Sequence, residues 1–124
     1  MNTIAAFCLA LNVYAEARGE IVEGQIGVAH VTINRMADPR YPDDICGVVY
    51  DPDQFSWTDQ PLWVNDEESL ARAMFVALSA LMTDQPDPTD GATHFYSGSP
   101  PKWAKAMVIT AQIGNHTFLK EPSQ

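Results

Sequence analysis

The apolar residues of this chain recur at helical spacing in three segments. In the first fifteen residues, MNTIAAFCLALNVYA, the stripe predicted to face the core is Ile4, Phe7, Cys8, Leu11 and Ala15. In the second segment, which starts after Gly19, the stripe is Val22, Ile26, Ala29 and Ile33. In the third segment, for which Asn65 is the expected N-cap, the stripe is Leu70, Ala73, Met74, Ala77, Leu78 and Leu81. The pattern therefore predicts three amphipathic helices.

The pattern changes between and after these helices. Residues 43–65 mix turn residues with aromatic side chains, which predicts a surface-lining loop without a regular element. Beyond the turn at residues 90–91, the segment ATHFYS alternates like a short strand. VITAQI and HTFL flank Gly114 and Asn115, a two-residue spacing typical of a tight hairpin. Helices followed by a small antiparallel sheet predict an α+β fold.

Length and charge limit the classes of function. At 124 residues, we expect one domain spanning residues 1–124, large enough to bury roughly two thirds of its unfolded surface. The formal net charge of −9 disfavours nucleic acid as a partner and gives no attraction to anionic membranes. The first fifteen residues lack a basic segment and are too short to span a bilayer. We therefore expect no targeting segment and no membrane insertion.

The two cysteines, Cys8 and Cys46, are too few for a disulfide scaffold or a zinc cage. One interpretation is a pair of buried thiols. The other is a disulfide, which requires that the first two predicted helices pack together and that the compartment is oxidising. Both interpretations stay open at this point.

The segment AEARGE, residues 15–20, ends the first predicted helix with two carboxylates four positions apart. Glu16 lies at the boundary between the predicted stripe and solvent, where partial burial by aromatic neighbours raises a carboxyl pKa and makes a general acid. The alternative is an exposed glutamate at a helix end. Glu20 lies on the same side of the helix, whereas glycosidases place two carboxylates on either side of the scissile bond. We therefore assign Glu20 a structural or orienting role.

The histidines His30, His94 and His116 are the candidate metal ligands. No two of them have the spacing HxH or HExxH, so neither a metal site nor a cofactor is predicted. We expect His30 to be packed or at the surface of the second helix. His94 and His116 lie on predicted strands, where cross-strand packing or polar support is the commoner role.

Residues 54–57 (QFSW) combine amide and hydroxyl groups with aromatic rings. This mixture suits sugar recognition, because rings stack on apolar sugar faces while amides bind hydroxyl and acetamido groups. The alternative is a loop held in place by buried aromatic side chains, and for Phe55 we favour that alternative. Tyr96, Trp103 and Asn115 have the same two interpretations.

Several of these segments together resemble the SleB-type cell wall hydrolases. The resemblance rests on NVYAEARGEIVEGQIGVAHVTINRM, on YPDDICGVVYDPDQFSW and then on HFY, W and IGNHTF. It runs from about Cys8 to Leu119, and the motifs EARGE, GQ, NR, GVVY, QFS and IGNH follow one another in the family's order. The family contains spore-cortex-lytic enzymes, related bacterial wall hydrolases and phage endolysins.

The resemblance implies a compact lysozyme-like domain that is mainly helical and has its small sheet near the C-terminus. It also implies cleavage of the MurNAc–GlcNAc glycosidic bond of peptidoglycan, as a lytic transglycosylase or a muramidase. The family's catalytic glutamate carries over to Glu16, as general acid and then base. The expected substrate-binding residues are Glu20, Gln54, Ser56, Tyr96 and Asn115.

Two other classes of function stay open. One is an N-acetylmuramoyl-L-alanine amidase that uses a metal held by His94, His116 and an acid, and the other is a non-catalytic wall-binding module. Among wall hydrolases, a single-domain chain without a signal peptide is more similar to a phage endolysin than to a spore enzyme. We expect such a protein to accumulate in the cytoplasm before its release and then to act on the wall from the periplasm or the extracellular face. We further expect a monomer whose partner is the glycan strand of peptidoglycan.

Overall fold

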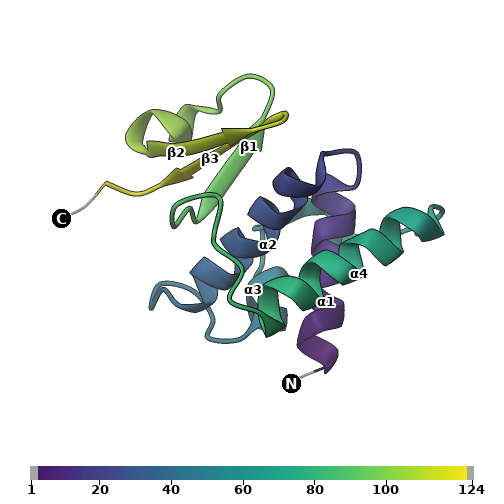
Figure 1. The fold of residues 1–124 in the computed structure, drawn as a ribbon. Coiled ribbons are helices and arrows are strands. Elements are labelled where there is room, and N and C mark those ends of the chain that lie inside the picture. The colour runs from purple at the N-terminus through teal and green to yellow at the C-terminus, as the bar shows by residue number, and fades with distance from the viewer. Residues whose placement is uncertain (1–2, 123–124) are drawn as a thin grey trace.

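The computed structural model describes residues 3–122 and confirms the predicted α+β architecture. The helices are α1 (Thr3–Ala17), α2 (Val22–Met36), α3 (Ile45–Val49) and α4 (Glu67–Met82), with short 3₁₀ helices η1 (Ser56–Asp59) and η2 (Lys102–Ala106). The strands are β1 (His94–Ser97), β2 (Val108–Ile113) and β3 (His116–Lys120). Figure 1 shows the sheet above α2 and shows α1 and α4 to the right of α2.

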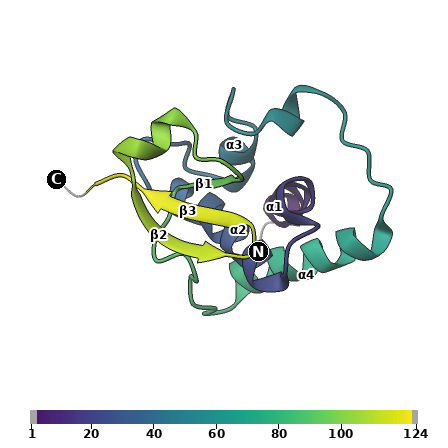
Figure 2. The ribbon, with the colours of Figure 1, turned by 90° about the horizontal axis from the view of Figure 1, so that it is seen from above.

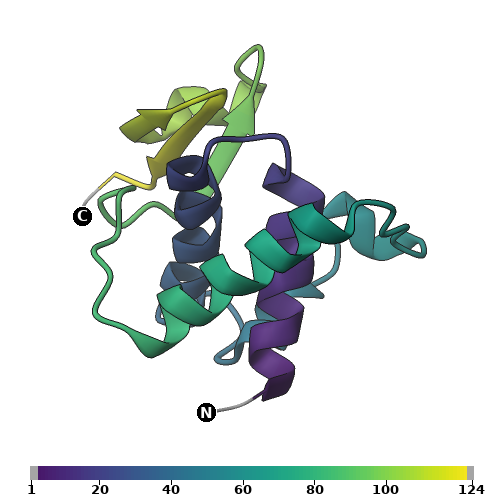
Figure 3. The ribbon, with the colours of Figure 1, turned by 45° about the vertical axis from the view of Figure 1, so that its right-hand side comes forward.

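Helix α1 is the centre of the helical part, because α2, α3 and α4 all pack against it (Figure 3). The predicted stripe on α1 is wrong at its start, since the side chains of Ile4 and Phe7 are 69% and 52% exposed. The buried positions are instead Ala6, Cys8, Leu9, Ala10, Asn12, Val13, Tyr14 and Ala17. Neighbours on several sides bury most of the circumference of α1 beyond its first turn, so a single stripe does not describe it.

Helix α4 begins one residue later than predicted. Its N-cap is Asp66, whose Oδ1 accepts a hydrogen bond from the backbone N–H of Ser69 at 3.0 Å. Asn65, the predicted cap, accepts instead from the hydroxyl of Tyr14 on α1. Of the predicted apolar face, Ala73 and Ala77 are buried together with Val76, and the larger side chains are partly exposed. Small residues at this contact suit a close approach of α4 to α1.

The region 43–65 contains two short helices, which the sequence pattern did not predict. Helix α3 is capped by Asp44, whose side chain accepts from the backbone N–H of Gly47 at 2.7 Å. The region is tied to α1 by the buried Asn12, whose Oδ1 accepts from the indole N–H of Trp57 at 2.8 Å. The polar residue that interrupts the apolar run of α1 is therefore a partner for this segment.

The sheet is antiparallel with strand order β1-β3-β2, as Figure 2 shows from above. β2 and β3 form the predicted hairpin, and Gly114 in its turn has a positive φ of 59°. The sheet packs on α2 at Gly27, where a Cβ atom would lie 2.7 Å from Cζ of Phe118. This close approach fixes the position of the sheet relative to the helices.

A disulfide joins Cys8 of α1 to Cys46 of α3, with the two Cα atoms 5.3 Å apart. It links the central helix directly to the segment that precedes the loop at residues 51–66. Within residues 3–122, no helix has the length and apolar composition that crossing a membrane requires.

Candidate active site

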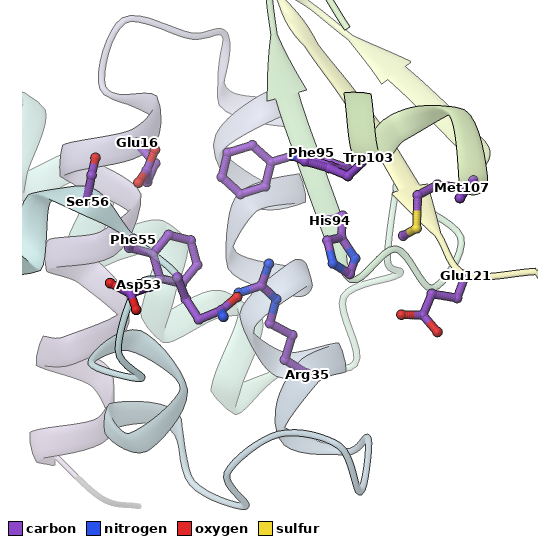
Figure 4. Close-up of a pocket in the computed structure, with 12 residues that line it drawn as sticks. Glu16, Arg35, Asp53, Phe55, Ser56, His94, Phe95, Trp103, Met107 and Glu121 are labelled. Atoms are coloured by element: carbon purple, nitrogen blue, oxygen red, sulfur yellow. The ribbon is translucent and has the colours of Figure 1, made fainter. Parts of the chain in front are cut away.

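A cleft of about 720 Å³ lies between the helical part and the sheet (Figure 4). This volume is within the range of small-molecule and cofactor sites. One wall comes from α1, α2 and the loop before η1, and the other comes from β1, η2 and the segments that flank β2 and β3. The lining residues are Glu16, Arg35, Asp53, Gln54, Phe55, Ser56, His94, Phe95, Trp103, Ala106, Met107 and Glu121.

Glu16 lies in the last turn of α1, and its side chain is half-buried at the cleft wall. Burial raises the pKa of this carboxyl above its ordinary value, while the positive charge of Arg35 acts in the opposite direction. A raised pKa keeps the carboxyl protonated to a higher pH, as a general acid requires. The structure thus places the predicted acid in a cleft, in the environment that its proposed chemistry requires.

Arg35, on the last turn of α2, is the cation of the cleft and is only 5% exposed. Its Nε donates to the backbone carbonyl of Thr93 at 2.7 Å, and Nη1 donates to Oε1 of Gln54 at 3.4 Å. Burial lowers the pKa of the guanidinium, and nearby acidic groups, including Glu16, oppose this shift. Sequence reasoning did not assign Arg35 a role in the site.

Aromatic rings form much of the cleft on the side of the sheet. The rings of His94 and Trp103 are 5.4 Å apart, and Phe95 packs at 5.1 Å from the ring of His116. Burial, followed by the charge of Arg35, lowers the pKa of His94 below its usual value, which favours a neutral imidazole. Tyr96 contacts Trp103 edge-on and is not among the lining residues.

The loop before η1 and the first residue of η1 supply two of the predicted substrate-binding residues. Gln54 and Ser56 are exposed and both line the cleft. Phe55 between them is buried, as we expected, and its ring stacks on Phe95 of the opposite wall. The loop therefore presents polar groups to the cleft while a buried ring holds it in place.

The structure places Glu20 and Asn115 together, and neither lines the cleft. Glu20 Oε1 accepts from the backbone N–H of Asn115 at 2.8 Å, and Oε2 accepts from the Asn115 side chain at 3.0 Å. Nδ1 of His116 lies 3.3 Å from the same carboxylate. The backbone N–H of Asn115 is the largest influence that lowers the pKa of Glu20. These contacts tie the turn between α1 and α2 to the β2–β3 hairpin.

Two further carboxylates, Asp53 and Glu121, also line the cleft. Asp53 has a positive φ of 66°, an uncommon conformation for a non-glycine residue that occurs often at functional sites. His30 is buried within α2, as one of its two interpretations required. In the part of the chain from residue 3 to residue 122, no three His, Cys, Asp or Glu side chains are grouped as the ligands of a metal ion would be.

The chain is similar in sequence to spore cortex-lytic enzymes. It is 34% identical to that of Halalkalibacterium halodurans over 113 residues, which covers 89% of this chain and 33% of that protein. It is 31% identical to that of Bacillus subtilis over 115 residues, which covers 89% of this chain and 35% of that protein. The chain thus spans about a third of the length of these curated relatives.

The fold is similar to two solved catalytic domains. The catalytic domain of the germination-specific lytic transglycosylase SleB from Bacillus anthracis matches with a TM-score of 0.81 and 28% identity, over 97% of each chain. The catalytic domain of the Bacillus cereus SleB protein matches with a TM-score of 0.77 and 29% identity, over 97% of this chain and 93% of that one. These matches confirm the expected lysozyme-like fold.

The sequence profile of the cell wall hydrolase family matches residues 19–119 of this chain. The match begins three residues after Glu16, so the role of that residue rests on the cleft and on the EARGE resemblance. This match and the similarity to the spore cortex-lytic enzymes both show the family of the chain. The chain belongs to the cell wall hydrolase family.

Proposed function

We propose that this protein is a lytic transglycosylase that cleaves the MurNAc–GlcNAc glycosidic bond of peptidoglycan, with Glu16 as its catalytic acid and base. The observation that carries the proposal is the half-buried Glu16 carboxyl, with its raised pKa, at the wall of a cleft large enough for sugar rings. Membership of the cell wall hydrolase family and the likeness to a lytic transglycosylase domain support the same reaction.

In the proposed reaction, the Glu16 carboxyl donates its proton to the glycosidic oxygen as the bond to C1 of the muramoyl sugar breaks. The N-acetylglucosamine that follows leaves with that proton as its hydroxyl hydrogen. The Glu16 carboxylate then takes the proton of the muramoyl C6 hydroxyl, and O6 bonds to C1. The products are an anhydromuramoyl end and a protonated Glu16, so no water is consumed.

A muramidase is the second candidate, and a specific observation favours it. Asp53 is a second carboxylate in the same cleft, and hydrolysing glycosidases use a pair of carboxylates. In that reaction, Asp53 would assist the attack of water, and the product would end in a reducing muramic acid. The product that ends in the muramoyl sugar is lighter by the mass of one water in the transglycosylase reaction.

The setting of the reaction is also part of the proposal. We propose that the protein acts as a monomer on the peptidoglycan of the bacterial wall, from the periplasm or the extracellular face. Release from the cytoplasm by a phage remains our hypothesis for its route to the wall. Size-exclusion chromatography with light scattering tests the monomer, and a mass near twice 13.7 kDa would contradict it.

The test is the Glu16→Gln variant, which keeps the shape of the side chain and removes its titratable proton. General acid–base catalysis contributes about 10² to 10⁴-fold to a reaction rate. The rate at which the variant degrades purified sacculi, followed as loss of turbidity, should therefore fall by at least this factor. Asp53→Asn is the matched control: it should keep activity in a transglycosylase and lose it in a muramidase.

Mass spectrometry of the wild-type digest should show anhydromuropeptides. Reducing muropeptides would favour the muramidase. Degradation of sacculi by Glu16→Gln at the wild-type rate would refute both candidates. Loss of wild-type activity in a strong chelator would favour the amidase.

A further inference from the structure

Arg35 is a buried cation that forms no ion pair within residues 3–122, although the charges of Asp51 and Glu16 act on it. The ion pairs among residues 3–122 involve the arginines Arg40 and Arg72, a further contact joins His116 to Glu20, and none involves Arg35. A buried charge without a paired charge is unfavourable for folding, because burial removes its hydration. Such a group is typical of sites at which a ligand supplies the missing partner.

The guanidinium is held rigidly with one nitrogen unused. Thr93 and Gln54 accept from Nε and Nη1, and Cζ lies 5.2 Å and 5.1 Å from the ring centroids of Tyr41 and Phe55. Nη2 donates to no group within residues 3–122. Nη2 is not one of the fully buried side-chain atoms of residues 3–122 that lack a hydrogen-bond partner. It is therefore accessible to solvent. In Figure 4 the guanidinium points into the cleft between Phe55 and His94.

The charges around Arg35 make it a selective site. The other charged residues that line the cleft are the acids Glu16, Asp53 and Glu121. The carboxylates of Asp53 and Glu121 therefore repel an anionic group of a ligand, whereas Arg35 attracts it. A guanidinium binds a carboxylate or a carbonyl oxygen through short, directional hydrogen bonds.

We infer that Arg35 binds the lactyl group of the muramoyl sugar and so places this sugar, rather than N-acetylglucosamine, beside Glu16. The inference rests on the proposed function, because it concerns the same cleft. The lactyl ether at C3 is the chemical difference between the two sugars. It ends in a carboxylate when the peptide stem is absent and in an amide carbonyl when the stem is attached. Both ends offer the oxygen acceptor that Nη2 lacks.

The experiment measures binding to protein that carries Glu16→Gln, so that no ligand is cleaved. The probes are a peptide-free tetrasaccharide of alternating N-acetylglucosamine and N-acetylmuramic acid, and a chitotetraose of equal length without lactyl groups. Isothermal titration should give tighter binding of the muramoyl probe. Adding Arg35→Gln should weaken the binding of the muramoyl probe by about 10-fold or more, because one charge-assisted hydrogen bond is lost. The affinity for chitotetraose should not change. Arg72→Gln, which removes an exposed arginine, is the control for net charge and should change neither affinity.

A second measurement needs no change at Arg35. The muramoyl probe with its lactyl carboxyl reduced to an alcohol should bind about 10-fold more weakly than the unreduced probe. Equal binding of these two probes, or an equal loss of both tetrasaccharides in Arg35→Gln, would overturn the inference. Turnover by the wild-type protein is assayed separately on sacculi. Failure of the proposed function therefore shows as absent cleavage, whereas failure of this inference shows as absent lactyl discrimination.

Discussion

Replacing Gly114 by alanine tests whether the hairpin turn holds the sheet against the helices through Glu20. Gly114 has a φ of 59°, and a Cβ at this position would lie 2.6 Å from Oε1 of Glu20. That oxygen accepts the backbone N–H of Asn115 at 2.8 Å. The Glu20 side chain is only 11% exposed, so we expect displacement of its carboxylate to break this hydrogen bond.

The expected loss of free energy of unfolding in Gly114→Ala has two parts. The left-handed conformation costs roughly 1–2 kcal/mol for a residue with a Cβ. Displacing the carboxylate loses at least one hydrogen bond to a charged group, worth about 1.5–3 kcal/mol. The free energy of unfolding should therefore fall by about 2.5–5 kcal/mol. For a chain of this size each kcal/mol lowers Tm by roughly 3–6 °C, so Tm should fall by about 8 °C or more.

Gly98→Ala is the matched control for the conformational part. Gly98 has a φ of 74°, and no atom lies within 4 Å of a Cβ built there. Urea unfolding of Gly98→Ala should show only the strain of about 1–2 kcal/mol. Gly114→Ala made together with Glu20→Ala should likewise show only the strain, relative to Glu20→Ala alone. If Gly114→Ala costs no more than Gly98→Ala, the contact with Glu20 does not stabilise the fold and the reasoning is refuted.

Two further predictions concern stability. Replacing Cys8 and Cys46 by alanine should lower the free energy of unfolding by about 4 kcal/mol, because the disulfide closes a loop with a sequence separation of 38. An unchanged urea midpoint, or two reactive thiols in the air-exposed protein, would contradict this prediction. The lowered pKa of Glu20 contributes stability that is present above its ordinary value of 4.5 and is lost as pH falls through the folded value. The stability difference between wild type and Glu20→Gln should therefore shrink from pH 6 to pH 3, and a constant difference would show that the carboxylate charge is not stabilising.

Local features were predictable from the sequence because their causes are local. The Gly114-Asn115 turn, its flanking strands and the strand at residues 94–97 follow from turn chemistry and from alternation over a few residues. Glu16 was predictable as a candidate because it lies at the edge of an apolar stripe and because EARGE resembles the motif that carries the family's catalytic glutamate. Its raised pKa also depends on residues that the fold brings to the cleft from other elements.

The first helix shows why the apolar stripe was only partly right. The predicted stripe included Phe7 and left out Leu9, yet Phe7 is exposed and Leu9 is fully buried. The buried set depends on where α2, α3 and α4 touch α1, and the sequence of α1 does not contain that information. Asn12 illustrates the same limit, because its partner Trp57 lies 45 positions away.

Arg35 could have been recognised from the sequence by a different argument. The buried positions Val28, Val31 and Thr32 precede it at helical spacing, so Arg35 continues a buried face of α2. A charged residue on such a face either pairs with another charge or serves a ligand. Sequence periodicity can identify that position, but it cannot show which of the two applies, since ion pairing is a property of the folded neighbourhood. The groups in contact with Arg35 are a carbonyl, an amide and two rings, and within residues 3–122 no carboxylate forms an ion pair with it. Arg35 is therefore a candidate for recognising the substrate.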